Sequence, residues 1–388
     1  MFLDPLFKLM AEKDASDLFI SNGAPISIKI LGNIMPVNQT IIDGGLTRKI
    51  AAELMNDKQA AVFEKDWEMN FSHVVPDVGR FRVNIFRQRN EVGLVIRYLR
   101  SGTPGIDKLR LPRMLKELVM EKRGLVLVVG STGSGKSTTL AAMIEHRNAL
   151  KAGHILTIED PMEFVFKSDK CVINQREVGT DTHSYGNALH NAMREAPDMM
   201  MIGEIRDRET LQHALLYAQT GHLCLSTLHA NNSYHALNRI INFFPHEARP
   251  ALVSDLSISL RAIISQRLIK ANDGTMAAAV EVMLNTKLVS EHIRKGEIEQ
   301  IKEAMEQSLT AGSKTFEQAL FELYQKGVIS KDEALHNSDS ATNLSWLINN
   351  YEQKAAGKIG ESPTGRVISK PGGNYSFSEI KLNVDEKR

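Results

Sequence analysis

The stretch Gly130-Ser131-Thr132-Gly133-Ser134-Gly135-Lys136-Ser137-Thr138 fits the phosphate-loop pattern G-x-x-x-x-G-K-[ST]. The apolar residues 125–129 precede it and favour a short buried strand, and residues 138–144 follow it with the spacing of a helix. A phosphate loop requires this order of strand, turn and helix. The sequence therefore predicts that residues 130–138 bind the phosphates of a nucleotide.

The residue types in this stretch explain its chemistry. Glycines allow the backbone to curl, so that successive N–H groups form an anion site at the N-terminus of a helix, where the helix dipole adds positive potential. We expect Lys136 to reach the β- and γ-phosphates of ATP and Ser137 to bind Mg²⁺. The alternative is a Gly- and Ser-rich turn without function, which would match the pattern in about one chain in a hundred of this length.

The composition is that of a globular protein without a strong overall charge. A chain of 388 residues predicts about two or three domains of ~150 residues each. The 43% hydrophobic and 24% charged residues are typical of soluble proteins. Lys and Arg total 47 against 46 acidic residues, so no overall field attracts nucleic acid or anionic lipid, and we expect no nucleic-acid partner.

The two cysteines, Cys171 and Cys224, are far apart in the sequence. They predict reduced thiols in a cytoplasmic protein, with a structural disulfide as the alternative, and they are too few for a zinc site built from cysteines. The N-terminus has no basic segment followed by an apolar core, and no apolar run approaches ~18 residues. We therefore expect a cytoplasmic chain that neither is exported nor spans a membrane by itself.

Residues 1–100 predict a small mixed α+β domain. The expected elements are two helices, at 3–11 and, capped by Thr47, at 47–64, and three strands, at 26–30, 79–86 and 93–100. The last two strands flank a polar turn and should form a β-hairpin. Residues 101–115, which Gly and Pro punctuate, predict a linker.

The first strand of this hairpin alternates between basic and apolar residues. Arg80 and Arg82 should lie on one face, and Phe81 and Val83 on the other. The ordinary explanation of these arginines is a solvated sheet face. The functional alternative is an arginine finger, a planar and permanently charged group that contacts a phosphate bound elsewhere.

Residues 116–347 predict an α/β fold, because short apolar strands alternate with helices as in a mostly parallel sheet. A helix at 109–121 should lead into it, and the candidate strands are 125–129, 155–158, 199–202 and 223–226. A largely helical region is expected from 248 to 347. Residues 348–388, where Gly, Lys, Ser, Pro and Asn accumulate from Gln353 on, predict a disordered tail.

Acidic residues follow two of these strands, at the edge where parallel sheets bind ligands. Residues 155–163 end in three carboxylates, and Glu204 follows the strand at 199–202. Such a carboxylate can hold Mg²⁺ through water or orient the water that attacks the γ-phosphate. Strands often end in charged residues, so these patterns gain weight only together with the phosphate loop.

The strand at 223–226 has a histidine on each side, His222 and His229. Two surface histidines are the ordinary explanation of this pattern. Because residues at opposite strand ends cannot converge on one ion without other ligands, zinc binding is disfavoured. A contact between an imidazole N–H and the γ-phosphate is the functional alternative.

Together these segments resemble four ordered motifs of the secretion ATPase superfamily, and the match is closest to the type IV pilus retraction ATPases. The motifs are Walker A at 130–138, an aspartate box at 158–163, Walker B at 198–207 and a histidine box at 220–229. The resemblance covers residues 1 to about 345. It implies a homohexameric ring whose protomers pair a PAS-like N-terminal domain with a RecA-like core and hydrolyse ATP in the cleft between the two domains.

The resemblance also implies roles for individual residues. Glu163 would polarise the attacking water, Glu204 would hold Mg²⁺ through water, and His229 would sense the γ-phosphate. Arg82 and Arg97 are candidates for reaching the nucleotide from the N-terminal domain. The implied ATP-binding residues are those of the whole loop, with Ser137 also a ligand of Mg²⁺: Gly130, Ser131, Thr132, Gly133, Ser134, Gly135, Lys136, Ser137 and Thr138.

Two departures from the family pattern refine the expectation. Assembly-type relatives carry a four-cysteine zinc module, which this chain cannot form, and the helix motif Ala-Ile-Arg-Asn-Leu-Ile of retraction motors is absent at residues 288–293. With the extra tail, this resembles a branch of the family that assists a PilT-type retraction motor in twitching motility. The implied partners are that motor and the inner-membrane platform protein at the pilus base.

Two other functions stay open at this point. An accessory ring or adaptor could bind a motor and contribute little hydrolysis itself. A DNA-translocating relative would need a basic stripe for phosphate contacts, which the near-zero net charge does not favour.

Overall fold

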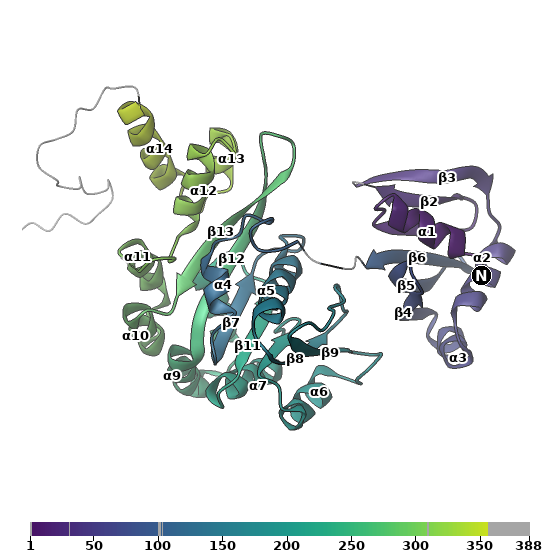
Figure 1. The fold of residues 1–388 in the computed structure, drawn as a ribbon, viewed down its shortest axis with the longest axis horizontal. Coiled ribbons are helices and arrows are strands. Elements are labelled where there is room, and N and C mark those ends of the chain that lie inside the picture. Colours follow the sequence, from purple (N-terminus) through teal and green to yellow (C-terminus); the bar gives the residue numbers. More distant parts are fainter. Residues whose placement is uncertain (1, 31, 100–101, 103, 309, 356–388) are drawn as a thin grey trace, which may run out of the picture. The chain divides into compact units, whose positions relative to one another are not determined.

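The computed structural model describes residues 2–30, 32–99, 102, 104–308 and 310–355. The chain divides into two compact units. The first comprises the described residues among 1–268 and 280–314, and it contains two β-sheets. The second comprises residues 269–279 and the described residues from 315 on. Figure 1 draws both with the element labels used below.

The N-terminal part of the first unit is a six-stranded sheet in the order β3-β2-β1-β6-β5-β4, with every neighbouring pair antiparallel. Its strands are β1 Asp17–Ile20, β2 Pro25–Ile30, β3 Asn33–Ile41, β4 Glu68–Val75, β5 Gly79–Gln88 and β6 Glu91–Leu99. Three helices accompany them: α1 Asp4–Glu12, α2 Gly44–Leu54 and α3 Asp57–Asp66. The mixed α+β character expected for this part is confirmed.

The predicted β-hairpin is β5 and β6. Its turn residues Arg89 and Asn90 both have positive φ, 50° and 63°, as a two-residue turn between strongly twisted strands requires. The alternation is also as expected, because Phe81, Val83 and Ile85 are fully buried. The ring of Phe7 from α1 packs 4.3 Å from that of Phe81, centroid to centroid, and so fixes the helix on this face of the sheet.

The single helix predicted at 47–64 is wrong, because the structure has two helices there. Asp43 caps α2 by accepting from the backbone N–H of Leu46 (2.7 Å), whereas Thr47 lies inside the helix. The chain is extended at Met55, and α3 then starts with a capping box between Asn56 and Gln59, both hydrogen bonds being 2.9 Å long. This reciprocal cap stabilises a new helix start and so ends the first helix.

The helix predicted at 109–121 is also shorter than expected. Only α4, Met114–Leu118, is helical. Arg110 has φ 55°, outside the right-handed helical region, and Pro112 has no backbone N–H to donate. These two residues prevent the helix from starting earlier.

The second sheet has seven strands in the order β13-β12-β7-β11-β10-β8-β9. Its strands are β7 Gly124–Val129, β8 Gly153–Glu159, β9 Cys171–Glu177, β10 Met199–Ile202, β11 Leu223–Leu228, β12 Leu260–Lys270 and β13 Met276–Leu284. The pairs from β12 through β7, β11, β10 and β8 to β9 are parallel. The four predicted strands and the mostly parallel α/β sheet are confirmed, whereas β9 was not predicted.

Helices follow the strands, as crossover connections between parallel strands require. They are α5 Lys136–Leu150, α6 Tyr185–Ala192, α7 Arg208–Gln219, α8 Ser233–Asn242 and α9 Arg249–Ser259. Further along the chain come α10 Lys287–Lys295 and α11 Ile301–Glu306. All six residues of β7 are buried, and Leu127 and Val129 belong to the main hydrophobic core.

The expectation of a largely helical region from 248 to 347 is wrong in part, because β12 and β13 lie within it. Residues 262–266 of β12 are all buried. A run of consecutive buried residues has neither the period of two of a half-buried strand nor the period of an amphipathic helix, so periodicity alone cannot tell a buried strand from a buried helix. Pairing with β7 places Ile263 opposite Leu127 and makes this segment a strand.

The second unit is built on α12 Phe316–Gln325, α13 Lys331–His336 and α14 Ala341–Ala355. Phe316, Leu320 and Leu344 are fully buried in its core. Ile348, where the tail was expected to begin, is also fully buried, because α14 continues through Ala355. The rest of the predicted tail, 356–388, lies outside the described residues. None of the helices in the described part of the chain is long and apolar enough to cross a membrane.

Truncation of Leu127 to alanine should destabilise the fold. The side chain is fully buried in β7, so Leu127→Ala leaves a cavity, and we expect the free energy of unfolding to fall by about 2–5 kcal/mol. Val172→Ala on β9, where the side chain is 60% exposed, is the matched control and should change it by less than about 0.5 kcal/mol. Urea unfolding followed by circular dichroism measures both, and equal losses would contradict the central place of β7.

Candidate functional site

The predicted phosphate loop joins the end of β7 to the start of α5. Gly133 and Gly135 have φ 78° and 88°, a left-handed conformation that glycine adopts without strain. Gly135 is the N-cap of α5, and no side chain caps the helix there. The first N–H groups of α5 therefore have no intrahelical acceptor and form the kind of site that binds an anion.

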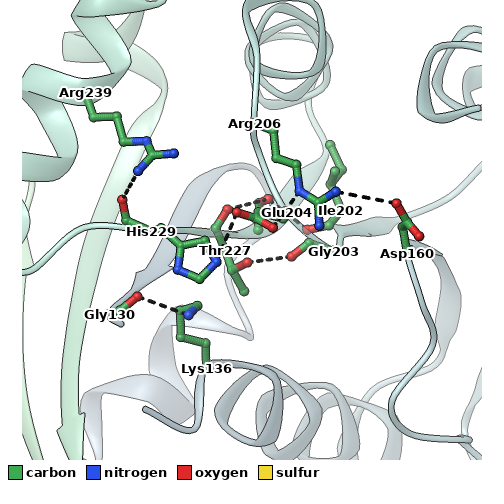
Figure 2. Close-up of polar contacts among 11 residues, drawn as sticks. Gly130, Lys136, Asp160, Ile202, Gly203, Glu204, Arg206, Thr227, His229 and Arg239 are labelled. Atoms are coloured by element: carbon green, nitrogen blue, oxygen red, sulfur yellow. Dashed lines mark hydrogen bonds and ion pairs between the residues drawn. The ribbon is translucent and has the colours of Figure 1, made fainter. Parts of the chain in front are cut away.

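Lys136 is folded back onto this loop. Its Nζ donates to the carbonyl oxygens of Gly130 (3.0 Å) and Ser131 (2.9 Å), and the contact with Gly130 is visible in Figure 2. Only 9% of the residue is exposed. Burial lowers the pKa of the Lys136 ammonium, and the charges of Glu204 and Glu163 act against that shift. A buried cation of this kind is stabilised by an anion close by.

A cavity of about 450 Å³ lies beside the loop, at the carboxyl ends of β8, β10 and β11. It gathers most of the predicted site residues, which come from segments almost a hundred residues apart. Those that line it are Thr132, Gly133, Gly135, Lys136, Ser137, Thr138, Glu163, Glu204 and His229. Gly130 and Ser131 border a second hollow, which His229 also lines, and Ser134 is buried in the loop.

Ser134 of the loop carries a buried hydroxyl that does not line the cavity. Its Oγ is fully buried and has no hydrogen-bond partner among the described residues. The hydroxyl of Ser137 and the carboxylate of Glu204 share the cavity, and Mg²⁺ prefers oxygen donors of this type. The uncapped N–H groups of α5 and the ammonium of Lys136 fit a phosphate group, and these oxygen donors fit Mg²⁺.

Glu204 follows β10 and is held from two sides, as Figure 2 shows. Its Oε2 accepts from Nε of Arg206 at 2.8 Å, and its Oε1 lies 3.3 Å from Nε2 of His229. The hydrogen bond to Glu204 raises the pKa of the Arg206 guanidinium. Only 14% of the Glu204 side chain is exposed, so its carboxylate is oriented within the cavity rather than solvated.

Arg206 extends the network to the tip of the neighbouring strand. One of its terminal nitrogens lies 3.6 Å from Oδ2 of Asp160, which directly follows β8. One guanidinium therefore contacts carboxylates from two strand ends. The sequence pattern singled out the acidic residues of this cluster but gave Arg206 no role.

Side-chain hydrogen bonds keep the ends of β10 and β11 in register. The Thr227 hydroxyl donates to the carbonyl of Gly203 at 2.6 Å, and the Ser226 hydroxyl donates to that of Ile202 at 2.8 Å. Arg239 of α8 donates to the carbonyl of His229 at 2.8 Å. These contacts fix where Glu204 and His229 stand relative to each other (Figure 2).

Glu159, the last residue of β8, is a buried acid in the cavity wall. Its Oε1 accepts from the hydroxyl of Thr157 (2.8 Å) and from the side-chain amide of Gln175 (3.4 Å). Burial raises the pKa of Glu159 to about 7, and these hydrogen bonds only partly oppose the shift. The sequence marked Glu159 as a strand-end carboxylate but could not show that it is buried.

Tyr185 also lines the cavity, and no sequence pattern pointed to it. Its hydroxyl lies so close to Gly203 that a Cβ at that position would come within 2.9 Å of it. Burial raises the pKa of the phenol. Because residue 203 is a glycine, the Tyr185 hydroxyl can lie close to the backbone directly before Glu204.

Arg82 and Arg97 lie on the N-terminal sheet, opposite each other on β5 and β6. Nε of Arg97 donates to the buried Asp17 at 2.8 Å. Like charges on facing strand positions repel, and Asp17 offsets this repulsion on one side. Their contact with a nucleotide stays a prediction, as do the roles assigned to the residues of the cavity.

Comparison with known proteins gives the site a family. The sequence matches the family described as "Type II/IV secretion system protein" over residues 1–357. It is 48% identical over 349 residues to the type IV pilus ATPase PilU of Pseudomonas aeruginosa, covering 90% of this chain and 91% of the relative. It is 41% identical to the retraction ATPase PilT of the same organism, over 86% of this chain and 97% of that one.

Solved structures agree in fold. The crystal structure of the pilus retraction motor PilT with bound ADP superposes with a TM-score of 0.81 at 39% identity, covering 86% of this chain and 96% of that chain. The ATPase DotB of Legionella pneumophila superposes with a TM-score of 0.72 at 24% identity, over 86% and 94% of the two chains, a level that supports the fold alone.

Glu159 should make the stability of the protein depend on pH. The pKa of this acid rises from 4.5 to about 7 on folding, so the folded protein binds more protons than the unfolded chain between these values and loses stability as the pH rises through them. Glu159→Gln cannot ionise and keeps an oxygen that accepts from Thr157. It should be more stable than the wild type at pH 8, by at most about 3 kcal/mol, and the advantage should vanish near pH 5.

Thermal unfolding from pH 5 to pH 8 measures this difference. Glu352→Gln serves as a control of opposite sign, because the hydroxyl of Tyr324 and the ammonium of Lys331 lower the pKa of Glu352. That variant should be less stable than the wild type at neutral pH, and its deficit should shrink in acid. A Glu159→Gln advantage that does not change with pH would contradict the burial of a titrating acid.

Proposed function

The chain belongs to the family of type II/IV secretion system proteins, and we propose that it is an ATPase motor that assists type IV pilus retraction. The observation that carries the proposal is the convergence of the phosphate loop, Glu204 and His229 on one cavity of about 450 Å³. A phosphate cradle alone supports binding. A cradle that faces an oriented carboxylate and an imidazole supports hydrolysis as well.

In this proposal the loop binds the phosphates of ATP. The N–H groups at the start of α5 donate to phosphate oxygens, and Lys136 leaves the carbonyls of Gly130 and Ser131 to pair with the β- and γ-phosphates. The Ser137 hydroxyl and the Glu204 carboxylate hold Mg²⁺, the latter through water. When bound, Mg²⁺ neutralises charge that develops on the phosphate oxygens.

The acidic wall of the cavity then acts on water. Glu163 is exposed at the cavity rim, where its carboxylate can accept a proton from the attacking water. His229, which Glu204 orients through Nε2, contacts the γ-phosphate and links its presence to the strand ends. Glu204 therefore has two tasks, holding the metal and fixing the imidazole.

A second set of groups would come from the N-terminal domain. We propose that this domain is PAS-like, that six copies of the chain form a ring, and that Arg82 and Arg97 reach a bound nucleotide. A guanidinium is always charged and presents several donors in one plane, so it suits a phosphate whose charge grows during transfer. The motion of these arginines toward and away from the nucleotide would couple hydrolysis to domain movement.

The cellular role follows from the relatives. PilU and PilT are described as type IV pilus ATPases, the latter a retraction ATPase. We propose that this chain cooperates with a PilT-type motor and with the platform protein at the inner-membrane base of the pilus. The segment Leu288–Ile293 lies in α10 and reads Leu-Val-Ser-Glu-His-Ile, without the motif of retraction motors. This difference is the reason for proposing an assisting motor.

Removal of the Lys136 ammonium should abolish hydrolysis. We expect Lys136→Ala to lower the rate of ATP hydrolysis by the purified protein at least about a hundredfold, because one group that stabilises phosphate charge is lost. Lys326→Ala is the matched control, because the Lys326 side chain is 70% exposed directly after α12, and it should hydrolyse ATP at the wild-type rate. Equal turnover by the wild type and Lys136→Ala would refute the proposal.

Pilus retraction in cells separates a motor from an adaptor. If the chain supplies force, retraction should persist when only the PilT-type partner lacks hydrolysis and should stop when Lys136→Ala is added. Twitching zones and fluorescently labelled pili measure this. Retraction that fails as soon as the partner alone is inactive would show that the chain is an adaptor.

A further inference from the structure

We propose that Gln266, which does not line the cavity, is a positioning residue of the phosphate loop. It would hold both ends of the loop in the curve that binds phosphate, acting through the Thr139 hydroxyl and through direct packing. The inference rests on the proposed nucleotide function, and it assigns part of that function to a residue of β12.

The first observation is a buried side-chain hydrogen bond. Oε1 of Gln266 accepts from the hydroxyl of Thr139 at 2.7 Å, and the two residues are 3% and 1% exposed. Thr139 lies in the first turn of α5, three residues after Lys136. The bond therefore ties the helix start, whose N–H groups face the cavity, to a strand that is 127 residues away in sequence.

The second observation is contact with the first and last glycines of the loop pattern. A Cβ at Gly130 would lie 2.6 Å from the backbone carbonyl oxygen of Gln266. A Cβ at Gly135 would lie 2.8 Å from Nε2 of the same residue. Gln266 thus lies against both ends of the loop, with its backbone at Gly130 and its side chain at Gly135. A side chain at either glycine would collide with it.

The sheet register explains this closeness. β12 runs parallel to β7, and Ser265 pairs with Val129, so Gln266 stands beside Gly130 where the loop begins. Gly130 leaves β7 at a place where β12 continues for several residues. β12 therefore extends beyond the end of β7, and the start of the loop lies beside it.

The neighbouring residue of β12 serves the opposite face of the sheet, because successive side chains on a strand alternate. The Ser265 hydroxyl donates to Oε1 of Glu281 at 2.8 Å, and the same oxygen accepts from the backbone N–H of Ser233 at 2.9 Å. Ser233 begins α8, four residues after His229. One short stretch of β12 thus positions the phosphate loop on one face and the helix after His229 on the other.

A pair that only stabilises the core would give a different result from a pair that positions the loop. Loss of a core hydrogen bond lowers the unfolding temperature and leaves the folded loop, and hence the affinity for nucleotide, unchanged. Loss of a positioning bond lets the helix start relax, so the affinity falls in protein that is fully folded. Affinity and stability must therefore be measured on the same variants.

The test uses the full chain and mant-ADP, a fluorescent ADP analogue, with thermal unfolding in parallel. Thr139→Val removes the donor at nearly constant volume, and Gln266→Met removes the acceptor at similar length. Each should raise the Kd for mant-ADP about tenfold, the scale of one buried hydrogen bond. Thr139→Ser keeps the hydroxyl and should return the Kd to within about threefold of the wild type.

The double variant adds a second criterion. Because Thr139 and Gln266 share one bond, Thr139→Val with Gln266→Met should weaken binding no more than about twofold beyond either single change. Thr47→Val, which removes another fully buried helical hydroxyl that donates to Gly44, is the control and should leave the Kd unchanged. If Gln266→Met fails to fold, Thr139→Val and Thr139→Ser decide the question together.

Two outcomes overturn the inference. The first is wild-type affinity in Thr139→Val, whether or not its unfolding temperature falls. The second is full additivity in the double variant, which would mean that the two side chains act separately. Failure of the wild type itself to bind mant-ADP would instead refute the proposed function and the inference with it.

Discussion

The parallel pairing of β7, β11, β10 and β8 is the constraint on which the site depends. Parallel strands end at the same edge of a sheet, so residues that follow them meet there whatever their distance in sequence. The phosphate loop, Glu204 and His229 each begin within two residues of the end of one of these strands. Hydrogen bonds between strand ends, such as that from Thr227 to Gly203, then set their spacing more finely than the backbone ladder alone could.

Several charged groups in the cavity are paired with one another or with backbone carbonyls. Lys136 donates to loop carbonyls, and Arg206 joins Glu204 to Asp160 across two strand ends. Such a network holds acids and bases ready in fixed positions, which reduces the reorganisation that a reaction requires. Arg206, which joins these carboxylates, lies outside the phosphate-loop pattern.

Sequence alone predicted the parts of the fold in which local signals agree. In the following segments the periodicity and the turn residues indicate the same structure: the loop at 130–138, its flanking strand and helix, and the β5–β6 hairpin. Prediction failed where a local signal was misread, as at the capping box of Asn56, or where burial erases periodicity, as in β12. Tyr185 and Gln266 could not be found from sequence, because their importance lies only in what the fold places beside them. The domain boundaries and the roles of the site residues remain predictions.

The buried acid at the end of β8 has a consequence for how the cavity receives a charged molecule. Burial penalises the charged form of the Glu159 carboxyl group and raises its pKa to about 7. This part of the cavity wall therefore repels a bound anion less than a fully ionised carboxylate in the same place would.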